Sequence, residues 1–204
     1  MGKTPQRILI ATGNKGKLRE FIDLFATWPI KILGLDDVGS VDEPEENGDT
    51  FRDNAVIKAA GYAKQTGKWV LADDSGLEIN ALGGAPGVHS ARYGGVDLNH
   101  SKKIELVLSQ LLESNSNDRS ARFVSAIVIA RPDGSIALEA IGECRGSIAE
   151  SPRGKNGFGY DPIFIPDGFD LTFGELSDEV KRSISHRGRA AREIIAKMPY
   201  FIGV

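Results

Sequence analysis

Two strand-like segments joined by a short turn constrain the fold of this chain most. Residues 123–130 and 135–142 are rich in apolar side chains, and the sequence Arg-Pro-Asp-Gly at 131–134 lies between them. Proline at the second position and glycine at the fourth are typical of a type I turn, so the two segments are predicted to form an antiparallel hairpin. Such a hairpin argues against a purely parallel, doubly wound sheet.

The remaining apolar runs alternate irregularly with helical patterns. A compact apolar run at 7–11 precedes a polar turn, and Leu18, Phe21, Ile22 and Phe25 then recur at helical spacing. The same patterns predict, in chain order, a strand at 30–35, a helix from Thr50, strands at 69–72 and 77–82, a helix at 104–111 and a last helix at 190–198. We therefore predict an α/β fold with a mixed β-sheet flanked by helices.

Charge and composition exclude several classes of protein. The chain has 204 residues, with 25 basic and 28 acidic side chains and a formal net charge of -3, so it has no global positive field for a nucleic-acid backbone. The single cysteine, Cys144, excludes an internal disulfide and a cysteine-rich zinc site. No apolar run approaches the roughly 18–20 residues of a membrane helix, and the first residues lack the apolar stretch of a signal peptide. We expect a cytoplasmic protein with no nucleic-acid or membrane partner.

The first candidate site is the polar turn Thr-Gly-Asn-Lys-Gly-Lys at 12–17, between the first strand and the first helix. Free N–H groups at a helix start, the helix dipole and lysine ammonium groups together favour an anion, and phosphate is the commonest one placed there. The segment does not have the Walker A pattern. An ordinary glycine-containing turn with solvated lysines is the alternative interpretation.

The second candidate site is Asp-Asp-Ser-Gly at 73–76, expected to follow the strand at 69–72. Adjacent carboxylates point in different directions, so one can bind a metal or a water while its neighbour holds the loop backbone. Carboxylates and water suit Mg²⁺, and a carboxylate near that ion can accept a proton from an attacking water. The four residues also suit a simple strand-ending turn, and this alternative stays open.

The loop and the helix start before the second site supply two further carboxylates, those of Glu46 and Asp53. Asp53, three residues after Thr50, fits a capping box at the helix start. Asn54 and Lys58 are four residues apart and therefore share one helix face. Glu46 comes from the acidic, turn-rich stretch at 36–49, which is predicted to be a loop.

Two further groups of residues could contact a nucleotide base. The segment 154–161 places two aromatic residues among glycines, which suits stacking of a base, although an aromatic side chain that fills the core beside a turn is the simpler alternative. Lys181 and the sequence Ser-His-Arg-Gly-Arg at 185–189 offer hydrogen-bond donors for base carbonyls or phosphates. A solvated, charged helix start is the usual explanation of such a cluster. His89 is interpreted as structural.

Taken in order, five motifs closely resemble the noncanonical purine nucleoside triphosphate pyrophosphatases, the inosine triphosphatase family. They are ATGNKGK, NGDTFRDNAVIKA, LADDSGLEINALGGAPGVHSARY, GFGYDPIF and SHRG, and they span essentially the whole chain. The resemblance implies a single domain over 1–204, a mixed α/β fold of two lobes with a central cleft, and a homodimer. It also implies Mg²⁺-dependent hydrolysis of ITP, dITP and XTP to the monophosphate and pyrophosphate.

The resemblance also implies a role for each matching residue. The triphosphate would be held by Thr12, Gly13, Asn14, Lys15, Gly16 and Lys17. Asp74 would be the proton acceptor and, with Glu46, a metal ligand, while Lys58 would place a cation beside the scissile bond. Ser75 would contact the nucleotide, and the base pocket would comprise Phe158, Gly159, Tyr160, Asp161, Lys181, His186 and Arg187.

The chain departs from the family pattern at one position, and two other functions are also compatible with these motifs. The family pattern often has glutamate where this chain has Asp53, so Asp53 is not assigned as a ligand. A pyrophosphatase of similar fold that acts on modified pyrimidine triphosphates or dTTP would share the phosphate and metal residues. A regulatory module that binds a nucleotide without chemistry would use Asp73 and Asp74 only as a structural turn.

Overall fold

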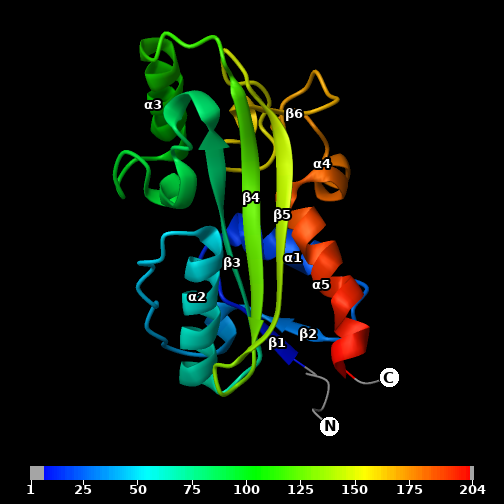
Figure 1. Cartoon of the computed structure of the whole chain (residues 1–204). Coiled ribbons are helices and arrows are strands. Elements are labelled where there is room, and N and C mark those ends of the chain that lie inside the picture. The colour runs from blue at the N-terminus through cyan, green and yellow to red at the C-terminus, as the bar shows by residue number, and fades with distance from the viewer. Residues whose placement is uncertain (1–6, 203–204) are drawn as a thin grey trace. The chain divides into compact units, whose positions relative to one another are not determined.

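The computed structural model describes residues 7–202, and Figure 1 shows its helices and strands. In chain order they are β1 (Arg7–Ile10), α1 (Lys15–Leu24), β2 (Lys31–Leu33), α2 (Phe51–Thr66), β3 (Val70–Ile79), α3 (His100–Glu113), β4 (Ser120–Ala130), β5 (Ile136–Ile148), β6 (Phe164–Pro166), α4 (Asp178–Ile184) and α5 (His186–Ile202). Residues 1–6, where we expect no signal peptide, lie outside the described range. Within the described range, no helix is long and apolar enough to cross a membrane.

The strands form a six-stranded sheet in the order β2-β1-β3-β4-β5-β6. β1 pairs in parallel with β2 and with β3, whereas β5 and β6 are antiparallel. The predicted mixed sheet of an α/β fold is therefore confirmed.

The predicted hairpin between β4 and β5 is also confirmed. The N–H of Gly134 donates to the carbonyl of Arg131, and the N–H of Arg131 donates to the carbonyl of Ser135, both at 2.8 Å. Gly134 has a φ of 86°, a left-handed conformation that glycine adopts without a steric cost. β5 continues to Ile148, six residues beyond the predicted end, and Cys144 is buried within this strand.

The chain divides into two compact units, which we describe separately. Unit 1 contains the described residues up to Asp74, the segment Ser125–Gly142 and the residues from Arg187 onward; unit 2 contains Ser75–Val124 and Glu143–His186. β3, β4 and β5 contribute residues to both units. The central cleft implied by the resemblance stays a prediction.

Each unit has its own apolar core. In unit 1, Phe21 of α1, Phe25 at the end of that helix and Ile194 of α5 belong to one buried cluster with strand residues, which include Ile8 and Ile127. In unit 2, side chains of α3 pack with Leu77 and with three aromatic rings, those of Phe123, Phe164 and Phe173. The helical patterns predicted for α1, α2, α3 and α5 are confirmed, except that Ile22 is 47% exposed.

The prediction of a strand that ends before Asp73 is wrong. β3 runs without a break from Val70 to Ile79, so Asp73 to Gly76 are strand residues and do not form a turn. Asp73 and Asp74 are both buried, and their charges are accommodated by ion pairs with residues distant in the sequence. Local turn propensity is therefore overridden by tertiary contacts.

Candidate active site

The turn at 12–17 connects β1 to α1 as predicted. Asn14 caps the helix, because its side-chain oxygen accepts hydrogen bonds from the N–H groups of Gly16 (2.9 Å) and Lys17 (3.1 Å). Thr12 accepts a hydrogen bond from the N–H of Asn14 (3.2 Å). We expect free N–H groups at this helix start, but those of Gly16 and Lys17 are already bonded to the Asn14 side chain. Gly13 and Lys15 are exposed.

Asp73 is the centre of a buried ionic network in unit 1. Its Oδ2 atom lies 2.8 Å from Nζ of Lys17 and 3.2 Å from Nη2 of Arg187, and its Oδ1 atom accepts a hydrogen bond from the hydroxyl of Ser125. Arg187, 2% exposed, also pairs with Glu20. Burial opposes the charge on Asp73, but the charges of Arg187 and Lys17 outweigh it and lower the pKa of that carboxyl.

Asp74 takes part in a different group of contacts, because successive side chains of a strand point to opposite faces. Its Oδ2 atom accepts a hydrogen bond from Nδ2 of Asn54 (3.2 Å), and its Oδ1 atom lies 3.5 Å from Nζ of Lys58. The same ammonium lies 3.1 Å from Oε2 of Glu46. Two predictions are thus confirmed: the adjacent carboxylates face different partners, and Asn54 and Lys58 act from one face of α2.

The pKa values of this second group are shifted in ways that suit acid–base chemistry. Burial raises the pKa of Asp74, partly opposed by the charge of Lys58, and a more basic carboxylate is a better proton acceptor. Burial alone would lower the pKa of Lys58, but the charges of Asp74 and Glu46 raise it overall. Lys58 therefore stays an ammonium. In the first group, burial lowers the pKa of Lys17 although Asp73 opposes the shift.

Glu46 and Asp74 fit the predicted magnesium site as a pair of carboxylates. Both carboxylates contact the same ammonium group, that of Lys58, so both lie on one side of α2. Among residues 7–202 no group of three or more histidine, cysteine or acidic side chains is arranged to hold a metal. A two-carboxylate site suits Mg²⁺, which commonly keeps several waters and binds substrate phosphates as well. The carboxylate of Asp53 instead accepts a hydrogen bond from the Thr50 hydroxyl (2.7 Å).

Three of the residues predicted to contact the base interact with one another within unit 2. Nζ of Lys181 lies 2.7 Å from Oδ2 of Asp161, and both side chains are buried. The same oxygen accepts a hydrogen bond from the N–H of Phe158 (2.7 Å), and the ammonium lies 4.8 Å from the centre of the Phe158 ring. Gly157 has a φ of 71°, and a Cβ there would lie 2.0 Å from Oδ2 of Asp161, so this turn requires glycine.

The other predicted pocket residues have separate surroundings. Tyr160 donates a hydrogen bond from its hydroxyl to the carbonyl of Ser90 (3.1 Å), and Gly159 adopts a left-handed φ of 62°. His186 stacks on Phe123, with ring centres 4.7 Å apart. Ser75 follows Asp74 in β3 and is half-buried. Arg187 belongs to the Asp73 network of unit 1, and its predicted contact with a base stays a prediction.

Sequence reasoning missed three members of these networks. Glu20 and Ser125 lie far from Asp73 in the sequence and have no motif of their own. The periodicity of α2 predicts the helix face of Asn54 but no contact with the second site. Its burial, with no exposed surface at all, distinguishes it from an ordinary polar helix residue.

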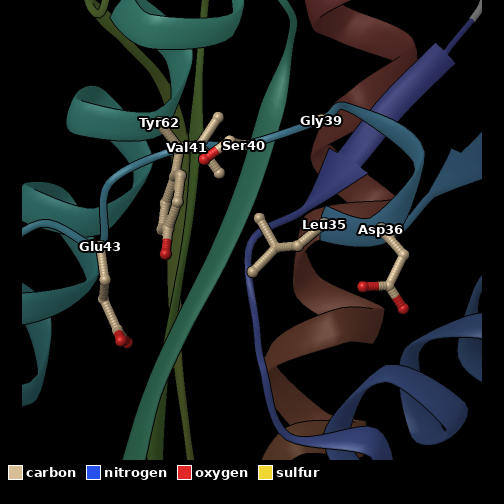
Figure 2. A pocket seen from close by; sticks show the side chains of 7 residues that line it. All are labelled: Leu35, Asp36, Gly39, Ser40, Val41, Glu43 and Tyr62. Carbon is tan, nitrogen blue, oxygen red and sulfur yellow. The ribbon is translucent and has the colours of Figure 1, made fainter.

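An open cavity of about 490 Å³ lies elsewhere in unit 1. Figure 2 shows its lining, in which the aromatic ring of Tyr62 on α2 and the side chain of Leu35 border carboxylates from the segment before α2. The lining residues are Leu35, Asp36, Gly39, Ser40, Val41, Glu43 and Tyr62. None of the predicted site residues lines this cavity.

Comparison with known proteins places the chain among close relatives. A model of the Ham1 family matches residues 8–197. A dITP/XTP pyrophosphatase of Nostoc sp. is 46% identical over 193 residues, which cover 94% of this chain and 93% of that protein. The structure of a HAM1 protein from Coxiella burnetii matches with a TM-score of 0.87 and 42% identity, covering 95% of this chain and 98% of the other. A nucleoside-triphosphatase (dITP/XTP pyrophosphatase) from Mycobacterium abscessus matches with a TM-score of 0.73 and 41% identity, covering 95% and 99%.

Proposed function

Because the chain belongs to the Ham1 family, we propose that it hydrolyses dITP, ITP and XTP to the monophosphate and pyrophosphate through the site built on Asp74. It is a hydrolase, a nucleoside triphosphate pyrophosphatase, as its relatives over nearly the whole chain are. This assignment removes the alternative of a binding module without chemistry. The finer assignments that follow are the substance of the proposal.

One observation carries the proposal: the adjacent carboxylates of Asp73 and Asp74 belong to different ionic groups. Asp73 is neutralised by Lys17 and Arg187 within the buried network. Asp74, with a raised pKa, faces Lys58 and Glu46. The first arrangement supports a folded site, and the second provides a proton acceptor beside a cation. Chemistry at a phosphate needs both a fixed scaffold and a reactive carboxylate.

In the proposed reaction, Asp74 accepts a proton from the water that attacks phosphorus. A new P–O bond forms with the water oxygen, the α–β phosphoanhydride bond breaks, and pyrophosphate leaves. Lys58, and Lys17 at the end of the 12–17 turn, stabilise charge that grows on the phosphoryl oxygens. Glu46 and Asp74 would hold Mg²⁺, which when bound neutralises phosphate charge and polarises the phosphoryl group.

We propose that Phe158 stacks on the base and that Lys181, with its neighbours, distinguishes the base edge. Hydrogen-bond donors near position 6 of a purine pair with the keto oxygen of hypoxanthine or xanthine. The amino group of adenine would leave those donors unpaired, so we expect discrimination against ATP. A homodimer and a cytoplasmic location are further parts of the proposal, supported by the family resemblance, and sedimentation velocity tests the dimer.

Pyrophosphate release from dITP, XTP, dTTP, ATP and GTP, measured in parallel with Mg²⁺ and with EDTA, tests the proposal. We expect release from dITP and XTP that requires Mg²⁺, with little from ATP and GTP. Preference for dTTP would retain the phosphate chemistry but overturn the assignment of the base pocket. Full activity in EDTA would overturn the role of the two carboxylates as magnesium ligands.

A further inference from the structure

The extended segment 42–48, which we call the strap, lies against one face of α2, and Figure 1 shows the chain before α2 running beside this helix. Gln65 accepts a hydrogen bond from the N–H of Asp42 (2.8 Å) and donates one to its carbonyl oxygen (2.9 Å). Gly61 is so close to the ring of Pro44 that a Cβ at position 61 would lie 2.6 Å from Pro44 Cγ. The strap is therefore fixed to the C-terminal half of α2.

The same helix face continues to hold the strap toward the N-terminus of α2. Lys58 pairs with Glu46 at 3.1 Å, and the side chain of Asn54 accepts a hydrogen bond from the N–H of Gly48 at 2.8 Å. Alternate strap residues thus meet helix positions that are three or four residues apart. These are the repeats of an extended chain and of one helix face, so the strap runs antiparallel to α2 in a fixed register.

Asn54 differs from the other anchors because it also contacts Asp74. Its Oδ1 atom accepts from Gly48, and its Nδ2 atom donates to Oδ2 of Asp74 at 3.2 Å. A backbone N–H can only donate, so the carbonyl oxygen of the amide must face Gly48 and its NH₂ group must face Asp74. The side chain is completely buried, and no charged or purely apolar side chain could satisfy both neighbours at once.

Gly48 approaches Asn54 more closely than any other residue type could. A Cβ at position 48 would lie 2.7 Å from Cβ of Asp53, 2.9 Å from Oδ1 of Asn54 and 3.0 Å from its backbone nitrogen. Cβ atoms essentially never approach other atoms to less than 3.0 Å. The absence of a side chain at Gly48 is therefore what allows the strap to reach the Asn54 amide.

We propose that Asn54 is a positioning residue, which ties the strap to Asp74 and so holds the carboxylate of Glu46 beside that of Asp74. Lys58 joins the same two carboxylates through its ammonium, but that contact depends on flexible side chains. The Asn54 amide instead joins the strap backbone at Gly48 to the side chain of Asp74. Gly48 is only two residues after Glu46 in the sequence. The kinetic consequence of this inference rests on the proposed function.

Three variants separate this role from a general effect on folding. Asn54→Leu keeps the branching and the number of side-chain heavy atoms and removes both hydrogen bonds. Gly48→Ala pushes the strap away and leaves Asn54 and Asp74 unchanged. Gln65→Met is the matched control, because it also removes two hydrogen bonds between α2 and the strap, but at the end remote from Asp74.

Two measurements are made on each full-length variant: hydrogen–deuterium exchange of the strap amides without metal, and pyrophosphate release from XTP over a range of Mg²⁺ concentrations. In Asn54→Leu and Gly48→Ala we expect faster exchange of the amide at position 48 and a loss of about 10–100-fold in kcat or in magnesium affinity, the usual cost of disturbing the support of a metal ligand. Raised Mg²⁺ should restore part of the rate. Gln65→Met should exchange faster at Asp42 and keep kcat within about twofold of the wild type.

The inference is overturned if Asn54→Leu and Gly48→Ala keep the wild-type kcat and Mg²⁺ dependence, or if Gln65→Met loses as much as they do. If Asn54→Leu fails to fold, Gly48→Ala decides, because it retains every member of the site. The exchange measurement does not depend on turnover. A wild type that releases no pyrophosphate would refute the proposed function, whereas unchanged exchange at Gly48 in Asn54→Leu would refute the tie itself.

Discussion

Asp73 and Asp74 are adjacent, yet replacing each by asparagine should affect stability in opposite ways. Asp73→Asn removes a buried carboxylate that lies 2.8 Å from Nζ of Lys17 and 3.2 Å from Nη2 of Arg187. Breaking a buried ion pair by removing one partner costs about 3–5 kcal/mol. Arg187 keeps its contact with Glu20, so Lys17 bears most of the loss and the lower end, about 3 kcal/mol, is expected. For a chain of this size, that free energy corresponds to a fall in Tm of about 6–12 °C.

Asp74→Asn should instead leave the protein at least as stable as the wild type at pH 7. The pKa of Asp74 is raised in the folded state by burial. A carboxyl whose folded pKa exceeds its unfolded value stabilises the fold below the unfolded pKa, and this contribution is lost as pH rises through the folded pKa. At pH 7 the Asp74 charge therefore costs stability, and asparagine removes that cost. Turnover should nevertheless be lost, since the proton acceptor is gone.

Thermal unfolding followed by circular dichroism, at pH 7 and at lower pH, measures both effects. The cationic partners of Asp73 lower its pKa in the folded state below the ordinary value of 3.8. The charge of Asp73 therefore stabilises the fold above about pH 4, and this stabilisation declines as the pH falls further. The difference in Tm between wild type and Asp73→Asn should therefore narrow below about pH 4. Equal Tm values for the two asparagine variants at pH 7, or a Tm of Asp74→Asn below that of the wild type, would refute this reasoning.

Three other outcomes follow from the same contacts. Lys58→Met removes the ammonium shared by Glu46 and Asp74 and should lower kcat for XTP by about 100-fold or more; steady-state pyrophosphate release measures it, and a loss below tenfold would contradict the role. Lys181→Met removes the ammonium that lies 2.7 Å from the buried carboxylate of Asp161 and should cost about 3–5 kcal/mol in urea unfolding, an unchanged midpoint being the contrary result. EDTA should abolish activity and added Mg²⁺ restore it, in assays of the same enzyme sample, and activity that persists in EDTA would contradict the metal assignment.

The best predicted part of the molecule is α2. Thr50 accepts a hydrogen bond from the N–H of Asp53 (3.1 Å) and caps the helix as expected. Asn54 and Lys58 then reach Asp74 from one face. These features depend on helix periodicity and capping, which are local properties of the sequence. The hairpin at 131–134 was predictable for the same reason.

The Asp73–Gly76 segment shows where local reasoning fails. Four turn-forming residues predict a turn, yet they lie within β3. The strand tolerates two buried carboxylates because Lys17, Arg187 and Lys58 come from other elements to neutralise them. The sequence around residue 73 does not predict these partners, which lie at positions 17, 58 and 187.

Arg187 has contacts that its motif does not predict. The resemblance implies a contact with the base, and the structure adds ion pairs of the guanidinium with Asp73 and Glu20. The same holds for Asn54, whose helix face follows from periodicity but whose contacts with Gly48 and Asp74 appear only in three dimensions. Contacts between distant segments decide such roles.

The most direct test compares pyrophosphate release from XTP by wild type, Asp73→Asn and Asp74→Asn, with Mg²⁺, at a temperature where all three are folded. We predict turnover by the wild type, none detectable by Asp74→Asn, and residual turnover by Asp73→Asn. The carboxylate that is lost in Asp73→Asn supports Lys17 and does not accept the proton. Near wild-type turnover by Asp74→Asn would contradict the central claim that this carboxylate activates the attacking water.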